Sequence, residues 1–177
     1  MSEFVSDRQK KILELLDTSG ARLHALLGRL TLSQDAAGDL MQELFLRLSK
    51  SGRLDKVNDR FAYAYRAAIN LAFEWRKSKK VKFQSLDEDC LPAGNSPNPL
   101  AKMVRAEELA QVLDMMGRLS ELAREVVVMH YIEQESYEAI GQRLGKKPQH
   151  IRSVSAKAMA RLRELLTGER VKPGSWE

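Results

Sequence analysis

Apolar residues recur at three- and four-residue spacing along most of the chain, which is the periodicity of amphipathic helices. Before residue 84 the apolar stripes run over 12–30, 40–48 and 61–73; after residue 103 they run over 109–116, 122–131, 137–144 and 151–165. Residues 126–132 are rich enough in β-branched side chains for a strand. No partner strand is evident elsewhere in the sequence, so we predict a helix there as well.

The pattern is interrupted once, over residues 84–100. Three of the five prolines lie in this stretch, together with a run of acidic residues. Proline ends helices and favours extended backbone around it, so we interpret the stretch as an interdomain linker. We therefore predict an all-α chain of two small helical domains joined by a flexible linker, the second a four-helix domain with a helix-turn-helix. The expected boundaries are 1–83, 84–103 (linker), 104–167 and 168–177 (a tail that we do not interpret).

The helix-turn-helix is predicted from the residues around one short turn. Ser136 is a candidate N-cap for a first helix, and Gly145 stands where a helix end favours a left-handed residue. Pro148 stands where a second helix favours its first residue. Two helices joined by a short, glycine-containing turn are typical of this motif.

The charge pattern makes DNA the expected partner of the second helix. The chain has a formal net charge of +5, but residues 139–163 alone hold seven Lys and Arg and no Asp or Glu. Such a block is the footprint of a polyanion partner, although a helical hairpin with a basic, solvated face is the plainer interpretation. The polar residues that this helix directs away from its apolar stripe are Gln149, His150, Arg152, Ser153, Lys157 and Arg161.

A second cluster combines aromatic and basic residues. Six of the chain's eleven aromatic residues lie within 61–83, interleaved with Arg and Lys. Aromatic rings beside cations suit unpaired bases, which need a face to stack on and a charge to hold the backbone. The spacing of Phe61, Tyr65 and Phe73 equally fits a plain helix core. Arg66, Asn70, Glu74 and Lys77 form a separate polar face that a core does not explain.

A third polar strip lies opposite or beside the apolar stripe of residues 40–48. It comprises Asp39, Gln42, Glu43 and Leu46. Such a strip is either solvated surface or a docking face, and the residues alone favour solvated surface.

Several classes of protein are disfavoured. A single cysteine, Cys90, cannot form an internal disulfide, so we expect a cytoplasmic protein; no apolar run is long enough for a membrane span. His24, His130 and His150 lie far apart, and no Gly-rich phosphate loop or nucleophile motif occurs. We therefore expect that the protein is not an enzyme and that it binds no cofactor and no metal ion.

The order of these parts resembles the bacterial RNA polymerase sigma factors of the sigma-70 family, in the extracytoplasmic-function (ECF) subfamily. The stretch AAGDLMQELFLRL is similar to the helix that docks on core polymerase. FAYAYRAAINLAFEWRKSKK is similar to the helix that melts and reads the minus-ten element. LSELAREVVVMHYIEQESYEAIGQRLGKKPQHIRSVSAKAMARLRELL is similar to the region that reads the minus-thirty-five element.

The resemblance implies roles for the three clusters. The strip Asp39, Gln42, Glu43 and Leu46 would bind core polymerase, which reverses the interpretation as solvated surface. Minus-ten single-strand contacts would come from Asn58, Arg60, Tyr63, Arg66, Asn70, Arg76 and Lys77. The six polar residues of the last helix would contact minus-thirty-five DNA. The implied partners are core polymerase, promoter DNA and, in many relatives, an inhibitory anti-sigma factor.

The sequence departs from the family pattern at four positions. Gly38 and Ala139 stand where Glu is common, Tyr63 where Trp is usual, and Val154 where Arg is common. Two other functions remain open on the residues alone: a stand-alone helix-turn-helix regulator and an α-helical adaptor that binds only proteins. The aromatic and basic cluster at 61–83 argues against both, because neither function needs it.

Overall fold

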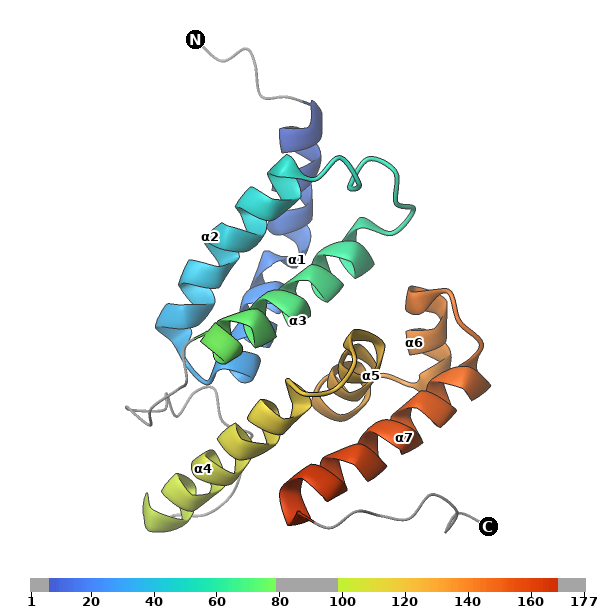
Figure 1. Cartoon of the computed structure of the whole chain (residues 1–177). Helices are drawn as coiled ribbons and strands as arrows, with labels where there is room; N and C mark the ends of the chain where they lie inside the picture. Colours follow the sequence, from blue (N-terminus) through green and yellow to red (C-terminus); the bar gives the residue numbers. More distant parts are fainter. Residues whose placement is uncertain (1–6, 79–98, 169–177) are drawn as a thin grey trace. The chain divides into compact units, whose positions relative to one another are not determined.

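The computed structural model describes residues 7–78 and 99–168, and every regular element in those ranges is helical (Figure 1). The predicted all-α class is confirmed. The chain divides into two compact units, Met1–Ala106 and Glu107–Glu177, which we call unit 1 and unit 2. Residues 84–98 of the proposed linker 84–103 lie outside the described residues.

Unit 1 is built on three mutually packed helices. These are α1 (Asp7–Thr31), α2 (Gln34–Lys50) and α3 (Arg60–Ser78), and each contacts the other two. Leu27, Leu44 and Tyr65 are fully buried, one from each helix. At the start of the predicted stripe 12–30, Ile12 and Leu15 are buried, whereas Leu13 is 52% exposed.

Local polar contacts fix the ends of these helices. Ser33 is the N-cap of α2, and its hydroxyl accepts a hydrogen bond from the Ala36 amide. The Asp59 carboxylate likewise accepts from the Ala62 amide in the first turn of α3. Between α2 and α3 the chain runs without a regular helix, but Leu54 anchors this segment by complete burial.

Unit 2 contains α5 (Glu121–Val127), α6 (Tyr137–Leu144) and α7 (Pro148–Thr167). Both α5 and α6 contact α7, which places the buried face of α7 in the core of the unit. The predicted chemistry of the turn is confirmed: the Ser136 hydroxyl accepts from the Ala139 amide, Gly145 is left-handed with a φ of 63°, and Pro148 begins α7.

Two stretches differ in detail from the predicted pattern. Residues Val128–Ile132 are helical as expected, but they form a π-helical segment, η2. Helix α4 (Pro99–Met116) begins five residues before the expected start of the second domain at 104. Proline is well suited to a first helical position, where no backbone N–H is needed. Among the described residues, no helix is both long and apolar enough to cross a membrane.

Candidate functional site

Helix α7 presents a continuous polar row to solvent. All six side chains predicted to contact duplex DNA are exposed: Gln149, His150, Arg152, Ser153, Lys157 and Arg161. The opposite face is held in the core by Ile151, Ala158 and Leu162, together with the buried hydroxyl of Ser155. The buried residues fix the rotation of α7 about its own axis, so the polar row stays exposed to solvent.

The turn before α7 is closely packed. A Cβ atom on Gly141 would lie 2.6 Å from the Lys146 carbonyl oxygen and 3.4 Å from the Pro148 nitrogen. Both neighbours are backbone atoms, so the turn itself would have to move. The close approach of α6 to the start of α7 therefore depends on glycine, and it sets the direction in which the polar row leaves the turn.

Two cations of the row also contact their own unit. The Arg152 guanidinium pairs with Glu138 of α6 and lies over the Tyr137 ring, 5.8 Å from its centroid. Arg161 pairs with Glu164 on the same helix, with 2.8 Å between nitrogen and oxygen. These pairs are more than half exposed on the arginine side, so a phosphate or base can compete for the guanidinium groups at modest cost.

In unit 1, most of the residues predicted to contact a single strand reach the surface. Asn58, Arg60 and Lys77 are exposed, and Arg66 and Asn70 are half-buried on α3. Tyr63 is also half-buried, and its hydroxyl shares a hydrogen bond of 2.9 Å with the Ser51 hydroxyl. The structure thus brings these six residues to α3 and the segment that precedes it.

Arg76 corrects the prediction. Its side chain is only 5% exposed, and its guanidinium donates a hydrogen bond to the Leu30 carbonyl oxygen of α1, 3.2 Å away. Residues 69, 72, 73 and 76 share one helical face, and that face is the buried one. Arg76 therefore joins two helices and does not present its charge to a ligand.

The core interpretation of the α3 aromatic residues is confirmed for two of the three. Tyr65 and Phe73 are buried, whereas Phe61 is half-buried near the start of the helix. The Arg22 guanidinium of α1 lies over the Phe61 ring, 4.9 Å from its centroid. A stacked pair of this kind was not predicted, because its members come from helices far apart in the sequence and share no local pattern.

The predicted docking strip lies on the outer face of α2. Asp39 and Gln42 are exposed, Glu43 is half-buried, and Leu46 is 47% exposed although it is a large apolar side chain. Arg47 adds a charge pair that the prediction missed. It bonds Glu43 at 2.9 Å and Glu74 of α3 at 2.8 Å, and the hydrogen bond to Glu43 raises its pKa above the ordinary value. The i,i+4 spacing of Glu43 and Arg47 was the available signal.

No cluster of three or more His, Cys, Asp or Glu able to hold a metal ion occurs within 7–78 or 99–168. What the two units offer is exposed polar and cationic surface on helices held by apolar cores. This arrangement can bind an anionic polymer or a protein.

The capped turn and the outward-facing α7 define unit 2 as a helix-turn-helix module. Residues 115–164 match the family model "Sigma-70, region 4". The RNA polymerase sigma-E factor of Streptomyces coelicolor is 32% identical over 162 residues, which cover 88% of each chain. The ECF RNA polymerase sigma factor SigE of Mycolicibacterium smegmatis is 30% identical over 156 residues, covering 86% of this chain and 60% of that protein.

Among solved structures, a chain is similar in the co-crystal structure of the sigma factor RpoE with the anti-sigma factor NepR from Bartonella quintana. It is 22% identical, with a TM-score of 0.45, and the match covers 94% of this chain and 100% of that one. On the sequence relatives, the chain belongs to the ECF subfamily of the sigma-70 family of bacterial RNA polymerase sigma factors.

Proposed function

We propose that this sigma factor acts in the cytoplasm as a promoter-specificity subunit with no active site of its own. It binds core RNA polymerase, holds the separated strand of the minus-ten element with unit 1, and binds the minus-thirty-five duplex with unit 2. The observation that carries this proposal is the polar row on α7: six exposed side chains on a helix whose inner face is locked in the core.

The row suits duplex DNA because a helix of this kind fits the major groove and directs hydrogen-bond donors at base edges. Gln149, Arg152 and Ser153 lie in the first half of α7, which enters the groove in helix-turn-helix proteins. Lys157 and Arg161 lie farther along, where phosphates are the natural partners of cations. Arg152 leaves Glu138 when it binds a base.

Unit 1 offers a different surface, which suits an unpaired strand. Asn58 and Arg60 are exposed where α3 begins, and Lys77 is exposed where it ends. Arg66 and Asn70 lie between them along the same helix. Arg76 takes no part, because its guanidinium is engaged with α1.

Core polymerase docks on the strip of Asp39, Gln42, Glu43 and Leu46. An exposed leucine beside carboxylates suits a protein partner that offers an apolar contact and a cation. An inhibitory anti-sigma factor stays a prediction, and its site is not assigned to any residue.

Reconstitution with bacterial core polymerase tests the proposal. We expect the chain to confer initiation at selected promoters, and D39K to lose polymerase binding in pull-down while its circular dichroism spectrum stays unchanged. D17K is the matched control, because Asp17 is an exposed acid on α1 and does not belong to the strip. Transcription no better than that of core polymerase alone would refute the function. A tight homodimer on palindromic DNA without polymerase would favour a stand-alone regulator.

A further inference from the structure

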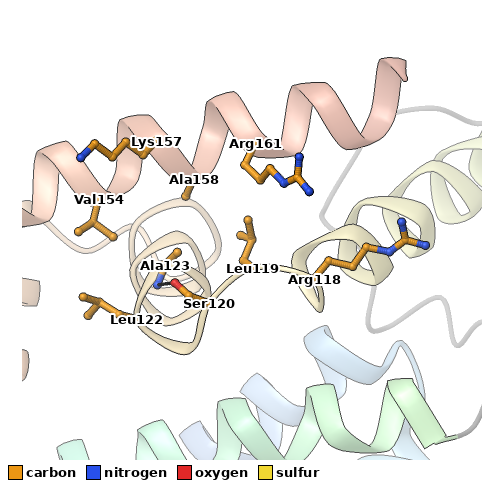
Figure 2. A pocket seen from close by; sticks show the side chains of 9 residues that line it. All are labelled: Arg118, Leu119, Ser120, Leu122, Ala123, Val154, Lys157, Ala158 and Arg161. Carbon is orange, nitrogen blue, oxygen red and sulfur yellow. Dashed lines mark hydrogen bonds between the residues drawn. The ribbon is translucent and has the colours of Figure 1, made fainter. Parts of the chain in front are cut away.

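A hollow of about 390 Å³ lies beside the polar row, within unit 2 (Figure 2). One wall is α7, which contributes Val154, Lys157, Ala158 and Arg161. The other wall is the turn between α4 and α5 together with the first turn of α5. Its lining residues there are Arg118, Leu119, Ser120, Leu122 and Ala123. The floor is apolar, and three cations lie at the hollow.

The charges at the hollow are of one sign. No carboxylate is among its lining residues, whereas Arg118, Lys157 and Arg161 each contribute a cation. Arg118 and Lys157 are exposed, and neither side chain has an ion-pair partner in the part of the chain that the structure describes. Among the described residues, the ion-pair partner of Arg161 is Glu164, and the Arg161 side chain stays 58% exposed. A ligand of this hollow must therefore be anionic and must also present an apolar surface.

We propose that the hollow binds the sugar-phosphate backbone of the promoter duplex, and that Arg118 is a DNA contact in addition to those on α7. A DNA backbone has both properties that the hollow requires, since its phosphates are anionic and the C–H faces of its deoxyriboses are apolar. The inference rests on the proposed function and deepens it. It adds a residue from the turn before α5 to a surface otherwise made by one helix.

Continuity with the polar row favours DNA over an acidic peptide. Lys157 and Arg161 belong to both the row and the hollow, so a duplex seated on α7 passes this wall without a change in position. Ser120 is not offered as a further contact, because its hydroxyl already accepts from the Ala123 amide. A phosphate contact positions the protein on DNA and carries no sequence information.

The salt dependence of binding gives the test. Fluorescence anisotropy would compare the full chain and R118Q on a duplex of about 30 base pairs that the reconstituted holoenzyme has selected. Losing one phosphate contact lowers the slope of log K against log salt by about 0.9, so the advantage of the wild type over R118Q shrinks about 3.5-fold between roughly 50 and 200 mM salt. Sequence preference should not change. R105Q is the matched control, because Arg105 is an exposed arginine of α4 that does not line the hollow.

A second readout locates the contact. The only cysteine, Cys90, is first replaced in C90S, and R118C in that background carries an iron chelate that cleaves nearby DNA. Cleavage of the backbone flanking the minus-thirty-five element, absent with R105C, would support the proposal.

An unchanged salt slope in R118Q overturns the proposal, as does a slope change that R105Q reproduces. Loss of affinity for a glutamate-rich amphipathic peptide in R118Q, with the DNA slope intact, assigns the hollow to a protein and also overturns it. The proposed function fails separately, when the wild-type chain does not support promoter-dependent transcription.

Discussion

Arg76 stabilises the end of α1 from a neighbouring helix. Its guanidinium bonds the carbonyl of Leu30, one of the last residues of α1, where helix carbonyls lack partners within their own helix. A cation there also interacts favourably with the helix dipole. Lys77, the next residue, is exposed and is proposed to hold DNA. Of these two adjacent cations, Arg76 therefore has a structural role, and Lys77 has the proposed DNA-binding role.

We expect R76A to destabilise the chain by about 1–3 kcal/mol, because it removes the donor and leaves a buried carbonyl without one. K77Q should change stability by less than about 0.5 kcal/mol, since its side chain is exposed, while it weakens single-strand binding. Urea unfolding and single-strand binding, measured on both variants, would separate the two effects. Equal loss of stability in both would contradict the structural role of Arg76.

Glycines 38 and 141 make a matched pair. G141A places a Cβ against two backbone atoms of the turn, so we expect a loss of about 1–3 kcal/mol and weaker duplex binding. G38A adds a Cβ with no atom within 4 Å inside α2, so we expect a gain of roughly 0.5–1 kcal/mol. Thermal unfolding of the two variants would test the pair. A stable G141A that still binds DNA would show that the turn can relax.

The burial of Arg76 shows where prediction from residue types fails. Ile69, Ala72 and Phe73 define the inner face of α3, and position 76 completes it at i+7. The spacing therefore indicated burial, but arginine is seldom buried and its charge suggested the surface. Burial of the Arg76 guanidinium is stabilised by its hydrogen bond to the Leu30 carbonyl oxygen. Leu30 lies in another helix, so the sequence around position 76 does not reveal this partner.

At the scale of elements, ion pairs fasten the segment between α2 and α3 to the start of α1. Asp55 bonds the Arg8 guanidinium at 3.0 Å and also pairs with Lys11 at 3.5 Å. Asp59 and the buried Leu54 hold the same segment from within. Asn58 lies in this segment, so its position depends on these contacts.

The pKa of Asp55 is below its ordinary value, chiefly because Arg8 donates it a hydrogen bond. The contact therefore stabilises the fold at neutral pH, and this stabilisation is lost as the pH falls through the lowered pKa. We expect D55N to lower the urea midpoint at pH 7 and to flatten its dependence on pH below about 5. D17N serves as the control. A D55N profile parallel to that of the wild type would contradict the prediction.

The elements of unit 2 were predictable because their ends carry local chemistry. Ser136, Gly145 and Pro148 each act on backbone groups within a few residues, so the sequence alone indicated the turn. The hollow was not predictable in the same way. Arg118 and Lys157 line the same hollow because packing in the core places α5 against α7.

At the scale of the whole molecule, each unit has its own core and its own candidate surface. Lys77 belongs to unit 1 and Lys157 to unit 2, and no contact between them is needed for either to bind a phosphate. The proposed function joins the two surfaces only through the DNA and the polymerase.

We therefore expect K77Q and K157Q to act independently on the stability of the promoter complex. The free energy of binding lost in the double variant should equal the sum of the losses in the two single variants, within about 0.5 kcal/mol. Holoenzyme dissociation rates from a promoter fragment would measure it. A larger deviation would show that the two surfaces are energetically coupled.

The π-helical segment η2 has a consequence for register. The Glu133 amide bonds the carbonyl of Val128, five residues back, so this turn accommodates one residue more than an α-turn does. Each residue of an α-helix advances the side chains by about 100° around the axis. Removing a single residue here would therefore rotate the side chains that follow it in η2 by about 100° relative to those of α5, and would change which of them face the core that holds Val128 and Met129.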